Sequence, residues 1–416
     1  MKMLRRLSEK KGYITSGSDI SLTGHDAKNV AGADFVVYNA AIPPCNPELL
    51  RAGELGIRTV GRSDYLAEIC DGYDFSIAVA GTHGKTTTTA MLWEVLLPLD
   101  PTVHIGGDYK GENGRIGGEK LFVTEACEYK RGFLNLSPDV AVVLNADLDH
   151  TDCYRDAADA ECSFLEFARR AKKLAVVPGD GGFVTTGLKN YMTVGLEKSN
   201  DYHPAAVKRE KGRYSFCVFN RGENLGRISL NVAGRHNMLN ALFCVAASLA
   251  CGLSFKEIAE GLARFKGVTR RTEYLGSRGA KQIFSDYAHH PREITATLTS
   301  ARESGYKNII AVFEPHTYTR TQSFFKEFAA ALHLADRVVL LPVFAARENP
   351  IDGADSHLIA SELKNRGKPA VLCDGYEAAT EYLNKYLNAD LKKNGLVLFM
   401  GAGTIDNLAR EFAKGY

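Results

Sequence analysis

The chain has 416 residues, of which 45% are hydrophobic and 24% charged, and its 51 Lys and Arg residues against 49 Asp and Glu residues leave a formal net charge of +2 at pH 7. This length suits two or three domains with a large core. The near-balance of charge provides no global field that would favour nucleic acid or an anionic membrane as a partner.

Targeting and membrane segments are not expected either. No run approaches the ~18 apolar residues that span a bilayer, and the basic start MKMLRRLSEKKGY continues into further charge instead of a signal-peptide core. The nine cysteines are odd in number and form no CxxC pair, which favours reduced thiols over a disulfide framework or a zinc site. These features predict a cytoplasmic protein.

Short β-branched runs alternate with helical stretches along the chain. In order they are DFVVYNAAI (34–42), FSIAVAG (75–81), VAVVLNAD (140–147), NIIAVFEP (308–315), RVVLLPV (337–343) and GLVLFMGAG (395–403). Strands that are apolar on both faces and alternate with helices predict an α/β fold with parallel sheets covered on each side. The segment 206–232 differs, because polar and apolar residues alternate around NRGENLG and predict an antiparallel hairpin.

Two breaks in this pattern predict domain boundaries. The acidic, aromatic CDGYDF (70–75) precedes one strand, and RFKGVTRRTEY (264–274) follows a helical stretch. We therefore expect three domains, covering 1–71, 72–266 and 267–416.

The segment SIAVAGTHGKTTTTA (76–90) has the order strand, glycine turn, Lys-Thr and helix. The usual phosphate loop has four residues between its glycines, whereas only Thr82 and His83 separate Gly81 from Gly84, and Val79 stands where the first glycine of the longer form would fall. The alternative is a threonine-rich helix start after a glycine turn. We favour a shortened phosphate loop, because all four parts occur in the required order.

The chemistry of such a loop follows from the helix start. Backbone N–H groups and the positive end of the helix dipole meet there, and glycines let the backbone approach a polyphosphate closely. Lys85 would contact the β- and γ-phosphates, and the Thr86 hydroxyl would join a Mg²⁺ shell.

Candidate metal ligands follow two other apolar runs. His150 lies in NADLDHTD (145–152), directly after a strand, where ligands gather in open α/β sheets. Oxygen ligands with an imidazole suit Mg²⁺ or Mn²⁺, and a solvated acidic loop is the alternative. Glu125 in FVTEACEYKR ends another run; a lone glutamate is more often solvated or paired, but beside a phosphate loop it becomes a candidate Mg²⁺ ligand.

Three later segments carry polar side chains at expected strand or helix ends. Asn237 and Asn240 lie at i and i+3 on one helix face, where their amides could bind a purine edge or simply cap the helix. The segments SDYAHHPREI (285–294) and FEPHTYTRT (313–321) suit a carboxylate or phosphate substrate. In FMGAGTID (399–406), Asp406 stands where a dinucleotide loop would have its third glycine, so we expect a packed strand-to-helix turn.

Taken in order, these motifs resemble the Mur ligase family of ATP-dependent amino-acid ligases over nearly the whole chain. That family uses a short loop of the form G-T-x-G-K-T-T, which stands here as GTHGKTTTT. EACEYKRGFL is similar to the form in Firmicutes-type bacteria, and the later matches are GRHNMLNAL, FKGVTRRTE, DYAHHPREI, FEPHTYTRT and MGAGTID. The resemblance implies a Rossmann-like N-terminal domain for a UDP-sugar, a central P-loop ATPase domain and a Rossmann-like C-terminal domain.

The resemblance also implies roles for individual residues. The ATP phosphates would be bound by Gly81, Thr82, His83, Gly84, Lys85, Thr86 and Thr87. Thr86, Glu125 and His150 would complete the metal sites. Asn237 and Asn240 would lie near ATP, Arg271 would reach the phosphates from the third domain, and Asp286 would bind the ribose. The amino acid and the acyl end of the sugar nucleotide would be handled by Tyr287, His289, His290, His316 and Arg320.

The implied reaction activates the lactyl carboxylate of UDP-N-acetylmuramate with ATP, and the amine of L-alanine then attacks the acyl phosphate. It is the first peptide-forming step of peptidoglycan precursor synthesis. Charge builds on phosphoryl oxygens and on a tetrahedral oxyanion, which suits metals, Lys85 and Arg271 as stabilising groups. Because these groups come from different domains, we expect domain closure to assemble the site.

The N-terminus departs from the family pattern. Family members usually begin with a strand and a glycine-rich turn that cradles the UDP diphosphate, whereas Met1 aligns just after those glycines. We expect that the start was assigned too late, the alternative being a truncated chain. Two other functions remain open: ligation of a murein tripeptide in recycling, and a non-catalytic relic that binds ATP·Mg²⁺ without substrate-dependent hydrolysis.

Overall fold

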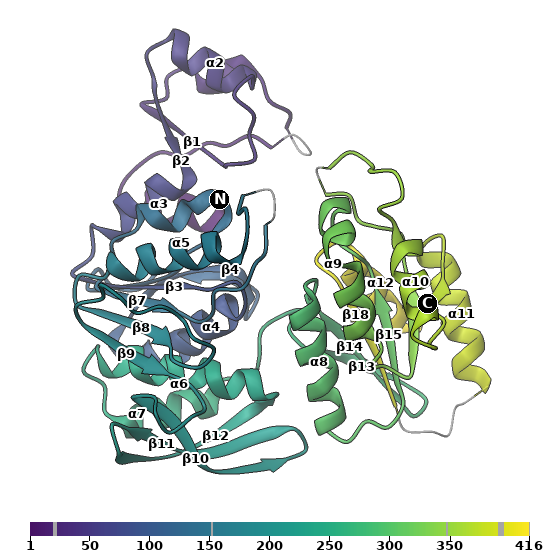
Figure 1. Ribbon diagram of the computed structural model, residues 1–416. Helices are drawn as coiled ribbons and strands as arrows, with labels where there is room; N and C mark the ends of the chain where they lie inside the picture. The colour runs from purple at the N-terminus through teal and green to yellow at the C-terminus, as the bar shows by residue number, and fades with distance from the viewer. Residues whose placement is uncertain (20–22, 151–152, 347, 390–394, 416) are drawn as a thin grey trace. The chain divides into compact units, whose positions relative to one another are not determined.

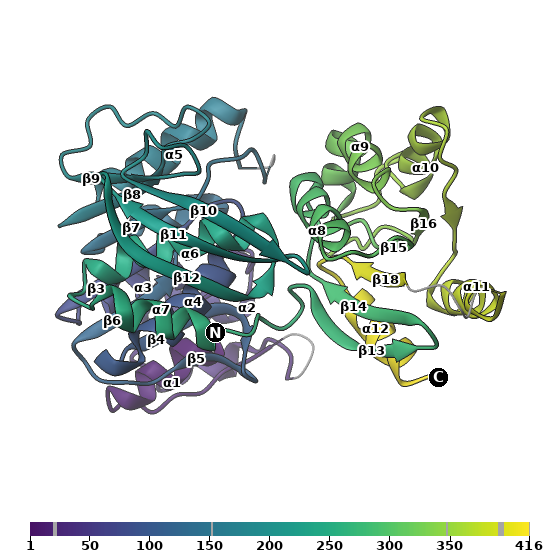
Figure 2. The same cartoon turned by 90° about the horizontal axis from the view of Figure 1, so that it is seen from below.

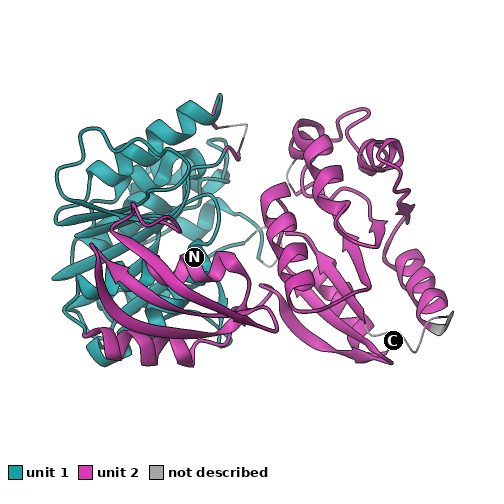
Figure 3. Cartoon of the chain, turned by 60° about the horizontal axis from the view of Figure 1, so that its bottom comes forward, with its two compact units in different colours: residues 1–147, 155–194, 243–253 teal, residues 148–154, 195–242, 254–416 magenta. Residues whose placement is uncertain are grey.

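The computed structural model describes residues 1–19, 23–150, 153–346, 348–389 and 395–415. Contacts between Cα atoms divide the chain into two compact units (Figure 3). The first contains residues 1–147, 155–194 and 243–253, and the second contains 148–154, 195–242 and 254–416. Each is described separately below. The predicted boundaries near residues 72 and 267 stay predictions.

The first unit contains a mainly parallel sheet with helices on both faces. Its elements are α1 (Lys2–Lys10), η1 (Ala27–Val30), β1 (Phe35–Tyr38), α2 (Pro47–Glu54), β2 (Arg58–Gly61), α3 (Arg62–Cys70), β3 (Phe75–Ala80), α4 (Lys85–Leu96), η2 (Leu97–Leu99), β4 (Thr102–Tyr109), β5 (Glu112–Arg115), β6 (Leu121–Glu125), η3 (Tyr129–Asn135), β7 (Val140–Val143), α5 (Ala157–Arg169), β8 (Leu174–Pro178) and β9 (Tyr191–Val194). Within the unit the strand order is β9-β8-β7-β3-β6-β4-β5, and β1 and β2 form a separate parallel pair. Strand β3 therefore lies between β6 and β7, with both of which it pairs in parallel.

Two layers of helix bury the central strands of this sheet. Helices α3 and α5 lie over one face and α4 lies under the other (Figure 1). Ala78 and Ala80 of β3 share a core with α1, α3 and α5, as expected for alternate side chains of one strand. The continuous apolar run of β3 thus reflects burial on both faces.

The second unit begins with an antiparallel ribbon, β10 (Tyr202–Glu210), β11 (Arg213–Asn220) and β12 (Glu223–Ala233), in the order β12-β11-β10. Both turns, Lys211-Gly212 and Arg221-Gly222, have positive φ at each residue, the type I′ geometry that suits twisted hairpins. The predicted hairpin in 206–232 is confirmed, and β10 adds a third strand to it. Helix α6 (Arg235–Leu249) follows and contributes residues to both units.

Helix α7 (Phe255–Arg264) packs against β12 of the ribbon. The rest of the second unit is a three-layer α/β arrangement. Its elements are β13 (Glu273–Arg278), β14 (Lys281–Asp286), α8 (Pro291–Glu303), β15 (Ile309–Phe313), α9 (Tyr318–Leu332), β16 (Arg337–Leu340), α10 (Ser356–Asn365), β17 (Val371–Leu372), α11 (Tyr376–Ala389), β18 (Gly395–Met400) and α12 (Ile405–Lys414). The sheet order is β13-β14-β18-β15-β16-β17, in which β13 is antiparallel to β14 and the other pairs are parallel. Helices α8, α9 and α10 share a core on one face, and α11 and α12 on the other (Figure 2).

The predicted α/β class is confirmed. Each of the six predicted apolar runs contains a strand, namely β1, β3, β7, β15, β16 and β18. FMGAGTID is the expected turn from β18 into α12. Within the described residues, none of the helices combines the length and apolar character needed to cross a lipid bilayer.

A buried carboxylate links β3 to the start of β7. Asp139 is 7% exposed, and its Oδ2 accepts hydrogen bonds from the backbone N (2.9 Å) and Oγ (3.3 Å) of Ser76. Lys173 Nζ lies 3.1 Å from the other carboxylate oxygen. Asp139 therefore satisfies a strand N–H that would otherwise be buried without a partner.

A second buried link joins β4 to β6. His104 is 4% exposed, its Nδ1 lies 3.0 Å from Thr124 Oγ1, and its Nε2 lies 3.3 Å from an Arg62 guanidinium nitrogen. Because the guanidinium can only donate, Nε2 accepts and the imidazole is neutral. Burial, reinforced by the charge of Arg62, lowers the pKa of His104 to about 3.

Replacing Asp139 with Ala should destabilise the first unit by about 2 kcal/mol, because the Ser76 N–H loses its partner. Trp93, the only tryptophan of the chain, lies in α4 and is 8% exposed, so its fluorescence during urea unfolding reports on this unit. The exposed Asp74→Ala is the matched control. A loss no larger than that of the control would contradict the role given to Asp139.

The neutral state of His104 predicts a pH dependence of stability. Because its pKa is about 3 when folded, against 6.5 for a model imidazole, the unfolded chain binds a proton first, and stability falls as pH drops below about 6.5. His104→Gln removes this proton uptake, so the variant should lose about 2 kcal/mol less than the unaltered chain between pH 7 and 5. Urea unfolding at both pH values, with exposed His357→Gln as control, checks this; parallel losses in both proteins would refute it.

Candidate active site

The predicted phosphate loop lies between β3 and α4. The strand ends at Ala80, Gly81 and Gly84 have φ of 142° and 86°, and α4 begins at Lys85. A Cβ on Gly81 would lie 2.9 Å from Leu144 Cβ, so only glycine fits at this position. In the described part of the chain no side chain caps α4, and its first N–H groups, which have no acceptor within the helix, are available to an anion.

The segment that follows β7 forms hydrogen bonds with this loop. Asn145 accepts a hydrogen bond from His83 N (2.9 Å) at Oδ1 and donates to His83 O (3.0 Å) from Nδ2. Thr82 Oγ1 donates to Asp147 O (2.8 Å), and Asp147 N donates back to Thr82 Oγ1 (3.0 Å). The sequence analysis missed Asn145. A polar residue directly after a buried strand was the available signal.

Lys85 is held by three neighbours. Its Nζ donates to Gly81 O (2.5 Å) and Thr82 O (3.2 Å), and it lies 2.9 and 2.8 Å from the two carboxylate oxygens of Glu128. Burial alone would lower the pKa of Lys85, but the facing Glu128 carboxylate raises it above its ordinary value. Lys85 is therefore an ammonium, and Glu128 is its counter-ion. Glu128 lies in the quoted EACEYKR segment but was given no role from the sequence.

Thr86 and Glu125 flank one glycine pair of β4. Glu125 Oε1 accepts from Gly106 N at 2.7 Å. A Cβ on Gly106 would lie 2.7 Å from the Glu125 carboxylate, and one on Gly107 would lie 2.9 Å from Thr86 Cγ2. Two oxygen-bearing side chains thus pack against the same short backbone stretch, where small residues leave room for them.

The proposed metal ligands Thr86, Glu125 and His150 stay a prediction. Among the described residues, no three His, Cys, Asp or Glu side chains gather where they could bind a metal ion by themselves. His150 lies in the second unit with a φ of 50°, and its N donates to Asp149 Oδ1 at 2.8 Å. Thr151 and Asp152 of the predicted acidic segment lie outside the described residues.

Asn237 and Asn240 meet in the first turns of α6, as their spacing predicts. Asn240 Nδ2 donates to Asn237 Oδ1 (3.3 Å), and Asn237 Nδ2 donates to Ala233 O (2.7 Å). Both are buried. The pair is thus ordered by its own hydrogen bonds, and its contact with a purine stays a prediction.

Asp286 ends β14 as a buried acceptor. Its Oδ2 accepts from Thr272 N and Thr272 Oγ1, both at 2.8 Å, and its Oδ1 accepts from Ala288 N at 2.8 Å. Burial raises the pKa of this carboxyl. Arg271 lies nearby: its guanidinium is 5.1 Å from the centre of the Tyr287 ring and 3.4 Å from Glu293 Oε1.

His289 and His290 directly precede α8 and contact Glu293. Glu293 Oε2 accepts from the backbone N of His289 (3.1 Å) and of His290 (3.3 Å), while His290 Nδ1 accepts from Arg292 N (3.3 Å). His290 is therefore the N-cap of a capping box followed by Pro291. His289 Nδ1 lies 2.9 Å from Tyr287 O, and burial lowers the pKa of His289 to about 3.

Arg320 forms a buried ion pair with Asp149. Arg320 Nη2 and Nε lie 2.8 and 3.1 Å from Asp149 Oδ1, and the two side chains are 9% and 8% exposed. Although burial opposes it, Arg320 lowers the pKa of Asp149. The third guanidinium nitrogen of Arg320, Nη1, lies 3.2 Å from His316 Nδ1. His316 and Arg320, both predicted from the sequence, thus belong to one cluster. Asp149 belongs to the same cluster but was not predicted.

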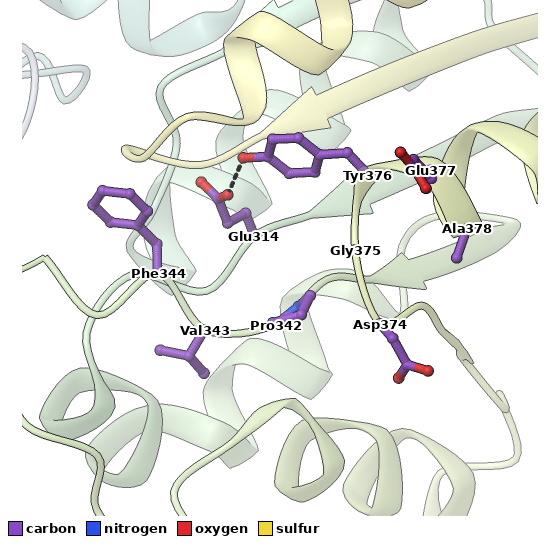
Figure 4. A pocket seen from close by; sticks show the side chains of 9 residues that line it. All are labelled: Glu314, Pro342, Val343, Phe344, Asp374, Gly375, Tyr376, Glu377 and Ala378. Atoms are coloured by element: carbon purple, nitrogen blue, oxygen red, sulfur yellow. Dashed lines mark hydrogen bonds between the residues drawn. The ribbon is translucent and has the colours of Figure 1, made fainter.

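A cavity of about 560 Å³ lies beside His316, at the carboxyl ends of β15 and β16. Its wall includes Phe344, whose ring stacks on His316 with a centroid distance of 5.6 Å. Glu314 and Tyr376 meet across it, with Tyr376 Oη donating to Glu314 Oε2 at 2.5 Å (Figure 4). Burial raises the pKa of Glu314. Ligands of open α/β sheets bind at such strand ends.

Three family models match consecutive parts of the chain. They are described as the Mur ligase family catalytic domain (residues 1–74), the Mur ligase middle domain (79–248) and the Mur ligase glutamate ligase domain (270–403). A curated relative, the UDP-N-acetylmuramate–L-alanine ligase of Acetivibrio thermocellus, is 40% identical over 430 residues, covering 97% of this chain and 91% of the relative.

Solved structures agree with these matches. The UDP-N-acetylmuramate-alanine ligase MurC of Thermotoga maritima has a TM-score of 0.79 and 28% identity, covering 98% of this chain and 90% of that one. The murein peptide ligase of Psychrobacter arcticus has a TM-score of 0.70 and 22% identity, covering 100% and 96%. The family models and the curated relative cover nearly the whole chain, and the fold agrees with them. The chain therefore belongs to the Mur ligase family.

Proposed function

We propose that this chain is an ATP-dependent ligase that joins L-alanine to the lactyl carboxylate of UDP-N-acetylmuramate through an acyl phosphate, the first peptide-forming step of peptidoglycan precursor synthesis. The observation that carries the proposal is the 40% identity, over nearly the full length of both chains, to a relative named for this reaction. The loop of residues 81–87 supports it, because its glycines and uncapped helix start suit a polyphosphate.

In the first unit, the loop would bind the ATP phosphates and Lys85 would contact their oxygens. The fit rests on geometry: Gly81 has no room for a Cβ, and Thr86 and Glu125 present oxygens beside Gly106 and Gly107. Mg²⁺ or Mn²⁺, when bound, would neutralise charge that develops on the phosphoryl oxygens. Thr86 and Glu125 are the proposed metal ligands from this unit, and His150 is the one proposed from the second unit.

In the second unit, buried polar groups would bind the rest of ATP and the organic substrates. We assign Asn237 and Asn240 to the adenine, Asp286 to the ribose and Arg271 to the phosphates. The substrates would be bound by Tyr287, His289, His290, His316 and Arg320. The Arg320–Asp149 pair supports the carboxylate assignment, because a substrate carboxylate would present the same oxygen chemistry to the guanidinium.

His289 would serve as a neutral hydrogen-bonding group at physiological pH. Its Nδ1 faces the Tyr287 carbonyl, and its pKa of about 3 keeps the ring uncharged. Such a ring can accept a hydrogen bond at Nε2 from an attacking amine. His289 would thus contribute near the acceptor amine.

We also propose that the chain divides functionally at about 72 and 267. Residues 1–71 would bind the UDP-sugar, 72–266 would bind ATP, and 267–416 would bind the amino acid and part of ATP. A cytoplasmic location fits substrates that are nucleotides.

A murein-tripeptide recycling ligase is the second candidate. The solved murein peptide ligase supports it through the fold alone, since its identity to this chain is 22%. The alanine-adding ligase is favoured, because curated relatives of that name match nearly the whole chain at 36–40% identity.

Lys85→Ala should reduce substrate-dependent ATP turnover by at least about 100-fold, because a positioned cation at the transferring phosphoryl group is lost. ADP release in a coupled assay measures this, and urea unfolding followed by Trp93 fluorescence checks that the fold is retained. Exposed Lys189→Ala is the control. Turnover within about threefold of the unaltered chain would rule out the role of Lys85.

The acceptor should be L-alanine. With UDP-N-acetylmuramate and ATP·Mg²⁺ present, ADP release should depend on L-alanine and should not respond to a murein tripeptide at the same concentration. Mass spectrometry of the product identifies the amino acid added. Turnover with the tripeptide but not with L-alanine would replace the leading function with the recycling ligase.

A further inference from the structure

All three N–H donors of the Lys85 ammonium have acceptors within the protein. A lysine ammonium has three N–H donors, and three groups accept from Nζ: Gly81 O at 2.5 Å, Thr82 O at 3.2 Å and Glu128 Oε1 at 2.9 Å. A phosphate oxygen can therefore accept a hydrogen bond from Lys85 only if Lys85 loses its hydrogen bond to one of these acceptors.

Glu128 differs from the other two acceptors in charge. Gly81 O and Thr82 O are neutral carbonyls of the loop itself, whereas both carboxylate oxygens of Glu128 lie within 2.9 Å of Nζ. The Lys85 and Glu128 side chains are 16% and 5% exposed, so solvent screens the pair weakly. A nucleotide that binds Lys85 must break this ion pair, and the free energy needed to break it weakens nucleotide binding.

Glu128 also has a second effect on an incoming nucleotide. Its carboxylate is negative, and it would remain near the phosphates after Lys85 turns towards them. Like charges at short range in a poorly screened site repel each other. Both effects act in the same direction and weaken nucleotide binding, most of all when no metal ion neutralises the phosphates.

We propose that Glu128 is a positioning residue that holds Lys85 at the loop, competes with phosphate for its ammonium and so sets the affinity of the loop for nucleotide. The inference rests on the proposed role of residues 81–87 in binding ATP. Glu128 follows β6 by three positions, and the ion pair joins that strand end to the start of α4. Lys85 is thereby kept at the loop, where a phosphate oxygen can replace Glu128 as its acceptor.

The test is the dissociation constant of ATP, measured by titration calorimetry in EDTA and again with Mg²⁺. Glu128→Gln keeps the size of the side chain and removes its charge, so ATP in EDTA should bind about tenfold more tightly. A residue with a merely structural role would weaken binding when replaced. Glu119→Gln, an exposed carboxylate just before β6, is the matched control and should leave the constant unchanged.

Glu128→Asp is the second variant. It keeps the charge on a shorter side chain, so its dissociation constant should lie closer to that of the unaltered chain than to that of Glu128→Gln. Equal or weaker binding by Glu128→Gln, or equal tightening by Asp and Gln, would overturn the inference. If the unaltered chain binds no ATP even with Mg²⁺, the proposed function fails as well; if it binds ATP·Mg²⁺ while Glu128→Gln gains nothing, only this inference fails.

Discussion

The candidate site depends on one steric constraint, the close approach of Gly81 to the end of β7. A Cβ at Gly81 would lie 2.9 Å from Leu144 Cβ, and the backbone there has a φ of 142°. This contact lets Asn145 and Asp147 bond the next two residues of the loop. The start of α4, Lys85 and Thr86 are consequently fixed by a strand that is remote in sequence. A side chain at Gly81 would separate the loop from its support.

Strand β3 lies between β7, which supports the loop, and β6, which carries two carboxylates. Strand β6 pairs with β3 opposite β7, and it delivers Glu125 and Glu128 to the same end of the sheet. Glu128 neutralises Lys85, and Glu125 contacts the Gly106 backbone. The two strands that flank β3 thus supply hydrogen bonds to the loop on one side and carboxylates on the other, at the strand ends where open α/β sheets bind ligands.

The sequence predicted those parts of the site whose signals are local. The strand, glycine turn and helix around Lys85 were predicted because their signals are contiguous, and the contact between Asn237 and Asn240 was predicted from their spacing. Asn145 and Glu128 were missed because their partners lie 62 and 43 residues away, and only the strand order β7-β3-β6 brings them together. The capping role of His290 had a local signal in His-Pro-x-Glu, but the histidine pair was interpreted only as substrate contacts. The Arg320–Asp149 pair spans 171 residues and had no local signal.

In the proposed reaction, ATP transfers a phosphoryl group directly to the lactyl carboxylate before the amine of L-alanine attacks. The most direct measurement uses UDP-N-acetylmuramate labelled with ¹⁸O in its lactyl carboxylate, together with ATP and L-alanine, and follows the label in the inorganic phosphate by mass spectrometry. If an acyl phosphate forms, one carboxylate oxygen leaves with the phosphate when the amide bond is made, so each phosphate released should carry ¹⁸O from the substrate. Formation of the alanyl product with unlabelled phosphate would contradict the account.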